Sequence, residues 1–569
     1  MQCVHYKRIK TNQFNDKKKN NEYDCWLISL SRKPMTTYAA PLPTRREDLL
    51  NRLAEPAVYD LAVVGGGATG LGVALDAASR GFRAVLLESH DFAKGTSSRA
   101  TKLLHGGVRY LAQGNISLVR EALHERTTLL RNAPHLAQPL AFVMPSYKWW
   151  ETPFYGAGLT AYDLLAGKAG LGKTEFLGAK DTQKLIPQVA TGGLKGGVKY
   201  WDGQFDDARL ALSLARTAAA KGALVVNYCK ATQLQYEAGK VCGVLCEDTI
   251  GGRKFSIQSR CVVNATGVWV DGLREKDGEA NSVDGRSTTK PMVAPSQGVH
   301  IVVDREFLGG DTALMVPKTQ DGRVLFAVPW LGKVILGTTD TPRHDLDREP
   351  RPFKEEVAFI LEEAARYLKK APTAKDIRSI WVGLRPLVKP QEDDGENTKA
   401  ISREHTVLVS RSGLVTVTGG KWTTYRAMAE DVLAKCAEKN LLESRAAGAT
   451  VHLRLQGADG EGVQQSAMSI PQGAHSYGLD YPAVHALPGS EVELAPGLTE
   501  AMVRFAARHE YAVTVEDVLA RRARTLFLDA RLAARLAPQV AQILVEETGL
   551  PSQEAEFVAL AARYTEIPA

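Results

Sequence analysis

Three glycines and one acid are the residues whose types and spacing point most directly to chemistry. Gly65, Gly67 and Gly70 stand at the G-x-G-x-x-G spacing after a short apolar run, and Glu88 ends the next apolar run. In this pattern the first glycine permits a tight turn, the second lets backbone approach a pyrophosphate, and the third lets a helix pack closely on a strand. The acid is placed to hydrogen-bond a ribose 2′-hydroxyl, which disfavours NADP. The stretch predicts a dinucleotide site for NAD or FAD.

The elements that must hold these glycines follow from the residues around them. Residues 59–64 are apolar and β-branched, as in a buried parallel strand, and residues 83–88 repeat the pattern. Between them, the small side chains of residues 68–80 predict a helix, which Gly81 ends. The order strand, glycine turn, helix and strand predicts a Rossmann-like unit.

Two later stretches have the same kind of turn. Residues 260–269, "RCVVNATGVW", and residues 413–436, which begin "GLVTVTGGKW", each place a strand before a turn of small residues. Residues 95–111, "GTSSRATKLLHGGVRYL", form a polar loop where an NAD domain would usually continue with a helix and a strand. Ligand-binding turns at such distant places predict a cofactor longer than NAD, bound across a domain of non-contiguous pieces. FAD fits that prediction.

These motifs carry a family resemblance. With "TSSRATKLLHGGVRYL", "VVNATGVWV", "FAVPWLGKVILGTTD", "GLRPLV" and "TGGKWTTYR" in this order, the chain from about Tyr59 onward resembles the FAD-dependent glycerol-3-phosphate dehydrogenases of aerobic respiration. These belong to the wider family of D-amino-acid-oxidase-like flavoproteins. The resemblance implies oxidation of sn-glycerol 3-phosphate to dihydroxyacetone phosphate by hydride transfer to FAD, with the electrons passed to a membrane quinone.

Carried over position by position, the resemblance implies an FAD site made of four groups of residues. They are Gly65, Gly67, Gly70 and Glu88 at the ADP half, Thr96, Ser97 and Ser98 near the pyrophosphate and flavin, Ala265, Thr266 and Gly267 at the second turn, and Gly419 and Gly420 beside the isoalloxazine ring.

The resemblance also implies a substrate cavity with catalytic and phosphate-binding side chains. These are Arg109, Tyr110, Arg385, Lys421, His300 and His105. Arginine can contact phosphate through a planar fork that lysine cannot copy. His300 is the first choice for the general base, because imidazole titrates near neutral pH, and His105 is the second. The alternatives are a structural histidine in the apolar segment "GVHIVVD" and ordinary surface ion pairs for Arg109 and Arg385.

The composition says less about binding partners than the motifs do. The formal charge of +7 suits an anionic small substrate or lipid, and no nucleic-acid motif accompanies it. No metal-binding pattern occurs, and the seven cysteines, an odd number, favour a reducing compartment. Because the resemblance implies electron transfer to a quinone in the bilayer, and no apolar run is long enough to span it, we expect a peripheral enzyme on the cytoplasmic, inner face of the cell membrane. The basic residues of the segment 499–548 are its candidate membrane contact, and a homodimer is compatible with the resemblance.

The predicted fold class is an α/β, Rossmann-like FAD-binding domain with an interleaved antiparallel-sheet substrate domain and a C-terminal helical domain. The expected segments are 57–130, 190–290 and 380–445 for the FAD domain, 131–189 and 291–379 for the substrate domain, and 446–569 for the helical domain. Residues 1–56 are expected to be a tail, either disordered or the product of a start codon placed before Met35.

Two rival functions remain open from the residues. An FAD-dependent oxidase of a D-amino acid or 2-hydroxy acid would reduce oxygen, and its substrate carboxylate would also bind an arginine. A non-catalytic or tRNA-modifying flavoprotein is compatible with the basic charge alone.

Overall fold

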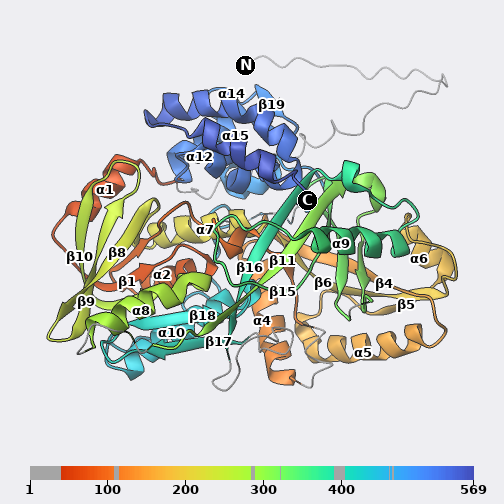
Figure 1. Ribbon diagram of the computed structural model, residues 1–569, viewed down its shortest axis with the longest axis horizontal. Coiled ribbons are helices and arrows are strands. Elements are labelled where there is room, and N and C mark those ends of the chain that lie inside the picture. The colour runs from red at the N-terminus through yellow and green to blue at the C-terminus, as the bar shows by residue number, and fades with distance from the viewer. Residues whose placement is uncertain are drawn as a thin grey trace, which may run out of the picture. The chain divides into compact units, whose positions relative to one another are not determined.

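A computed structural model describes residues 40–568, apart from 108–114, 283–286, 288, 321, 390–403, 461, 464 and 466. The predicted Rossmann-like unit is present as β1 (Val58–Val64), α2 (Ala68–Ser79) and β2 (Ala84–Leu87), with β1 and β2 parallel. Arg80 is the C-cap residue of α2, and Gly81 follows with φ of +79°. The local sequence therefore predicts this unit to within one or two residues (Figure 1).

The unit lies inside a sheet whose strands come from distant parts of the chain. The strand order is β17 (His405–Val409), β18 (Val415–Gly419), β10 (Lys254–Asn264), β1, β2 and β7 (Leu224–Val226), and the hairpin β8 (Cys229–Glu237) and β9 (Lys240–Asp248) pairs onto β10. From β18 to β7 neighbouring strands are parallel. Helix α2 packs between α7 (Asp207–Ala220) and α10 (Tyr425–Glu438), and this cover explains the continuous apolar sequence of the strands.

A second, mainly antiparallel sheet holds the other long strands. Its order is β15 (Thr341–Pro342), β11 (Val293–Asp304), β14 (Lys333–Gly337), β13 (Leu325–Trp330), β12 (Ala313–Val316), β4 (Ala137–Ser146), β6 (Gly196–Phe205) and β3 (Leu103–Leu104), with β16 (Ser379–Val388) paired to β11 and β5 (Glu175–Gly178) paired to β6. The alternating run predicted as a hairpin forms the antiparallel pair β13 and β14. The helices of this region are α4 (Ile116–Asn132), α5 (Glu151–Ala166), α6 (Ala179–Leu185) and α9 (Lys354–Tyr367).

The predicted boundaries between the FAD domain and the substrate domain stay a prediction, but the pairing of two strands does not follow them. β6 and β16 lie in segments assigned to the FAD domain, yet both pair within the antiparallel sheet. β6 leads directly into α7, which packs on β7, and β16 contacts β18, so these two strands connect the two sheets.

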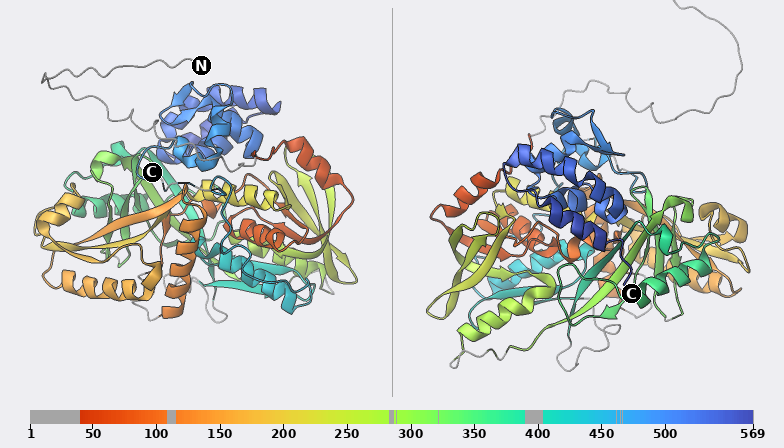
Figure 2. Two further views of the ribbon diagram at one scale, coloured as in Figure 1. Left: turned by 180° about the vertical axis from the view of Figure 1, so that it is seen from behind. Right: turned by 45° about the horizontal axis from the view of Figure 1, so that its top comes forward.

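The C-terminal region is mainly helical, as predicted. Its main elements are α12 (Glu500–His509), a π-helix (Asp517–Arg522), α13 (Thr525–Leu528), α14 (Ala530–Thr548) and α15 (Glu554–Arg563). We call residues 499–564 the helical module. It contacts β16 through α13 and α7 through the π-helix, and Figure 2 shows it from two further sides. The fold class predicted from the sequence is confirmed.

Within the described part of the chain, no helix is both long enough and apolar enough to cross a membrane.

Candidate functional site

The predicted cofactor residues gather at the carboxyl ends of β1, β2 and β10. One cavity there is lined by Gly65, Gly67, Glu88, Thr96, Ser97, Ala265, Thr266 and Gly267. This edge of a parallel sheet is where α/β proteins bind their ligands. The structure thus brings together turns that lie some two hundred residues apart in the sequence.

The glycine turn has the geometry that close ligand approach requires. A Cβ atom on Gly70 would lie 1.9 Å from the carbonyl oxygen of Gly65, so only glycine lets α2 pack this closely. A Cβ atom on Gly67 would have one neighbour within 4 Å, the Ser97 hydroxyl oxygen at 3.1 Å. Gly67 therefore opens on the cavity, and a larger side chain there would occupy ligand space.

Glu88 presents its carboxylate at the end of β2. One carboxylate oxygen accepts a hydrogen bond from the Gly66 N–H at 2.6 Å, and the other accepts one from the His90 N–H at 2.9 Å. The backbone thereby fixes an acceptor at the cavity wall. A helix N-terminus, two glycine turns and this acid fit the pyrophosphate and ribose of a dinucleotide such as FAD.

A second cavity adjoins the first, since Thr96 lines both. Its walls include predicted catalytic and flavin-side residues from four separate segments, namely His105, His300, Arg385, Gly420 and Lys421. Phe142, Met315 and Phe326 add apolar surface. The cavity therefore combines cationic and imidazole side chains beside the cofactor site.

Some predicted site residues lie elsewhere. Gly70, Ser98 and Gly419 line neither cavity. Ser98 is fully buried, and its carbonyl oxygen accepts hydrogen bonds from inner side chains. Arg109 and Tyr110 lie outside the residues that the structure describes.

His300 is held at the cavity wall by two neighbours. Its Nε2 lies 2.9 Å from the Thr101 hydroxyl oxygen, and its ring stacks on Trp381 with 4.1 Å between ring centroids. Burial lowers the pKa of His300 well below its ordinary value, and the positive charges of Arg385 and Lys102 lower it further. The expectation of titration near neutral pH is therefore wrong, because the side chain is only 2% exposed. Burial and the nearby positive charges therefore favour the uncharged imidazole of His300.

Arg385 is held by hydrogen bonds in the wall of the same cavity. It donates hydrogen bonds to the carbonyl oxygens of Gln297 at 3.1 Å and Thr339 at 3.0 Å, and to the Thr338 hydroxyl at 3.1 Å. Asp340 lies 3.4 Å away. Because these contacts orient the guanidinium inside a cavity, Arg385 is not an ordinary surface ion pair.

Sequence reasoning missed three residues that shape this wall: Thr101, Lys102 and Trp381. A signal for Trp381 was present, because residues four apart on a strand share a face and Arg385 follows it on β16. Thr101 and Lys102 lie within the motif that supplied Thr96 and His105. Nothing in their types predicted that they lie beside His300.

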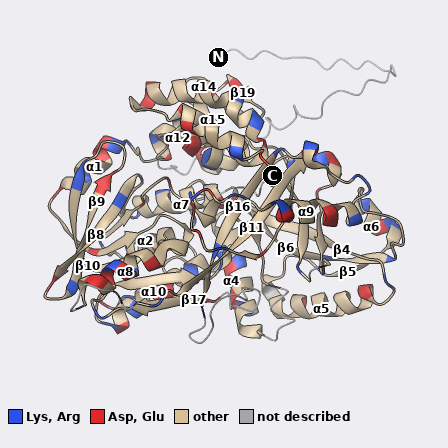
Figure 3. Ribbon diagram, in the orientation of Figure 1, with Lys and Arg blue, Asp and Glu red and all other residues tan. Residues whose placement is uncertain are grey.

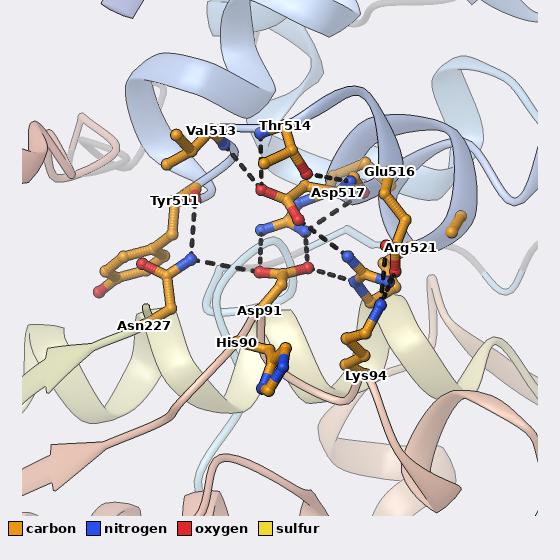
Figure 4. A network of polar contacts seen from close by, with 12 residues as sticks. His90, Asp91, Lys94, Asn227, Tyr511, Val513, Thr514, Glu516, Asp517 and Arg521 are labelled. Carbon is orange, nitrogen blue, oxygen red and sulfur yellow. Dashed lines mark hydrogen bonds and ion pairs between the residues drawn. The ribbon is translucent and has the colours of Figure 1, made fainter. Parts of the chain in front are cut away.

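The loop that follows β2, with Asp91 and Lys94, is held in place by contacts with the helical module (Figure 4). Asp91 accepts hydrogen bonds from Arg521 and Arg522, and Lys94 donates to both carboxylate oxygens of Glu516 at 2.6 and 2.7 Å. Burial would raise the pKa of Asp91, but Arg522 and Arg521 hold it below its usual value. Since Lys94 lines the cofactor cavity, ion pairs from the module set the position of this cavity's wall.

Comparisons with known proteins extend over both sheets and the module. A family model described as FAD dependent oxidoreductase matches residues 60–426, and one described as the C-terminal domain of alpha-glycerophosphate oxidase matches residues 448–555. A Caenorhabditis elegans protein named probable glycerol-3-phosphate dehydrogenase, mitochondrial, is 38% identical over 544 residues, or 90% of this chain and 74% of that protein. The mitochondrial glycerol-3-phosphate dehydrogenase of Rattus norvegicus is 38% identical over 553 residues, with the same two coverages of 90% and 74%.

A solved structure agrees with these matches. The glycerol-3-phosphate dehydrogenase from Bacillus halodurans, complexed with FAD, has a TM-score of 0.72 and 29% identity, and the match covers 92% of this chain and 98% of that one. The similarity therefore includes the helical module as well as the glycine turn.

Proposed function

Because the chain belongs to the FAD-dependent glycerol-3-phosphate dehydrogenases of the FAD-dependent oxidoreductase family, we propose that it oxidises sn-glycerol 3-phosphate in the cavity that holds His300 and Arg385. The product is dihydroxyacetone phosphate. The observation that supports this assignment is that Thr96 lines both cavities, so that the cavity with the His300 imidazole and the Arg385 guanidinium adjoins the cofactor cavity.

The side chains have different proposed roles in the oxidation of the substrate alcohol. FAD, when bound, accepts the hydride from the substrate carbon. Arg385, whose two terminal nitrogens already donate to protein oxygens, attracts the anionic substrate by its charge, and Lys421 adds positive charge next to the Gly420 turn. His300 accepts the hydroxyl proton. Its uncharged form is ready to do so, and the negative charge of the bound phosphate favours the imidazolium that results.

The substrate assignment has a direct test. Under anaerobic conditions sn-glycerol 3-phosphate should bleach the flavin absorbance of the purified holoenzyme, whereas glycerol, which lacks the phosphate, should do so poorly. D-amino acids and 2-hydroxy acids serve as the comparison. Bleaching by glycerol as fast as by its phosphate would contradict a phosphate site, and bleaching by a D-amino acid or a 2-hydroxy acid alone would support the oxidase instead.

We further propose that electrons leave to a quinone and that the protein binds the surface of a membrane through α5. The outer face of this helix is apolar and solvent-exposed. Phe154 is 66% exposed and Leu164 is 79% exposed, and Trp149 just before the helix is 82% exposed. In Figure 3 most of α5 carries no charged residue. Exposed aromatic side chains on one helix face fit the boundary between lipid headgroups and acyl chains.

The residues around α5 also support a membrane surface as its partner. The Phe176 ring lies against Gly156 of α5, and the rings of Trp150 and Phe154 are 6.0 Å apart, so the apolar surface is continuous. Lys148 is exposed beside it and suits anionic headgroups. The cysteine usage of the sequence favours the cytoplasmic side of the membrane.

Five of the seven arginines in the segment 499–548, which was expected to supply the contact, are buried or paired with acids, whereas Arg531 and Arg535 are exposed. Arg521, Arg522 and Arg524 are fully buried, and Arg504 and Arg508 pair with Glu547. Charges engaged in this way contribute little attraction to a lipid surface. The expected membrane contact therefore moves from the helical module to α5.

Replacing Trp149 and Phe154 together with serine should weaken binding to anionic liposomes by about tenfold or more, because two exposed aromatic side chains no longer enter the lipid. Sedimentation with the liposomes measures the effect, and kcat with a water-soluble electron acceptor should stay unchanged. Val545→Ser, which removes an exposed apolar side chain from α14, is the matched control. Equal binding by wild type and the double variant would rule out α5 as the contact.

A further inference from the structure

A buried lysine that the proposed chemistry does not use lies directly behind the substrate cavity. Lys102 is fully buried between Thr101 and Leu103, both of which line the cavity. Its ammonium donates to the Ser98 carbonyl oxygen and to an Asp207 carboxylate oxygen, each at 2.7 Å. Fully buried lysines are rare, because removing an ammonium group from water is costly unless it is paired. The position of Lys102 therefore calls for an explanation beyond packing.

The third neighbour of this ammonium is the indole of Trp381. The Lys102 Nζ atom lies 4.6 Å from the centroid of that ring, a cation–π contact. The imidazole of His300 stacks on the same indole, with 4.1 Å between centroids and 20° between planes. The imidazole and the ammonium therefore have the same indole as a neighbour, and we call these three side chains the stack.

We propose that Lys102 is a positioning residue that acts through Trp381 to keep His300 uncharged and oriented toward Thr101 in the substrate cavity. A cation against the indole disfavours a second cation, the imidazolium, against the same ring. The indole also fixes the plane of the imidazole, and the hydrogen bonds of Lys102 keep the ammonium in place. This role rests on the proposed function of His300 as the base.

Both cations that face His300, Arg385 of β16 and Lys102, lower its pKa. Lys102 itself is faced by Asp206 just before α7, by Asp207 of α7 and by Arg524 of the helical module. Burial lowers the pKa of Lys102 to about 7, and Asp207 opposes that shift.

The same interactions set the response to pH. Below about pH 7 the ammonium form of Lys102 prevails, and its charge helps to hold the pKa of His300 low. Removing this charge must therefore raise the pKa of His300, while burial and Arg385 still keep it below the ordinary value.

The test compares neutral and charged replacements in the full-length holoenzyme. Lys102→Gln removes the charge and retains donors for Ser98 and Asp207, and Lys102→Met removes both. Lys102→Arg retains the charge. NMR titration of protein labelled with ¹³C-histidine, with the His300 signal identified from His300→Gln, measures the protonation midpoint. We expect the midpoint to move to higher pH in the two neutral variants and to stay near the wild-type value in Lys102→Arg.

Enzyme kinetics provides a second readout. The acid limb of the pH profile of kcat/KM should move in the same direction as the NMR midpoint in Lys102→Gln. Arg209→Met is the matched control, because Arg209 is a buried cation 4.2 Å from the Tyr477 ring and paired with Glu510, and it lines neither cavity. It should lower thermal stability without moving the His300 midpoint.

Two outcomes separate this proposal from the proposed function. An unchanged His300 midpoint in the neutral variant that folds would overturn the role of Lys102, whatever the activity. A shifted midpoint together with an active His300→Ala variant would instead keep the stack and remove His300 as the base.

Discussion

Replacing Gly67 with leucine is expected to give a folded protein that has lost its yellow colour. Only the Ser97 hydroxyl lies within 4 Å of a Cβ at this position, and φ of Gly67 is −81°, so the backbone accepts a side chain without strain. The leucine must then extend into the cavity where the pyrophosphate of FAD approaches the turn. Absorbance at flavin wavelengths and titration with FAD should show binding weakened by at least about 100-fold.

The control is the same substitution at a glycine with open space but no ligand nearby. A Cβ atom on Gly192 would have no neighbour within 4 Å, and Gly192 lines neither cavity, so Gly192→Leu should retain FAD. A yellow Gly67→Leu protein with unchanged FAD affinity would show that the pyrophosphate does not pass this turn.

Replacing His300 with alanine should lower the rate of flavin reduction by about 100-fold or more. The substrate hydroxyl then lacks its proposed proton acceptor, and the stack on Trp381 is lost. Stopped-flow mixing of the oxidised holoenzyme with sn-glycerol 3-phosphate measures the step. Substrate affinity should change less, because Arg385 still holds the anionic end.

The variant Thr101→Val is a second test of the role of His300, with a smaller expected effect. It removes the hydroxyl that lies 2.9 Å from the His300 Nε2 but leaves the imidazole in place, so we expect a smaller loss of rate than in His300→Ala. If His300→Ala lowers the melting temperature and leaves flavin reduction nearly unchanged, the histidine is structural.

How far the sequence predicts this molecule depends on how local each feature is. The unit of β1, α2 and β2 is predictable because its glycines and apolar runs act within about 30 residues. The discontinuous FAD domain is inferred from turns that recur along the chain and from the family resemblance. β6 and β16 pair within the antiparallel sheet although their segments are assigned to the FAD domain, since an apolar strand does not reveal its partners.

The chemistry of the site is less predictable than its location. That His300 is buried, and hence uncharged at neutral pH, follows from its tertiary neighbours Trp381 and Arg385 and not from its own segment. The basic residues of the helical module look available to a membrane in the sequence, whereas Arg521 and Arg522 are buried against Asp91. Charge counted along a sequence does not show which ions are already paired.

The ion pairs of Asp91 also join two parts of the chain that are synthesised at very different times. Arg521 is separated from Asp91 by 430 residues, so it leaves the ribosome long after the glycine turn has been made. At about 5–20 residues per second, the delay is roughly 20 to 90 seconds. Throughout that interval the carboxylate lacks the partners that make its burial favourable. A chain that ends before Arg521 leaves Asp91 without these partners, so we expect such a truncated protein to bind FAD more weakly than the full-length chain.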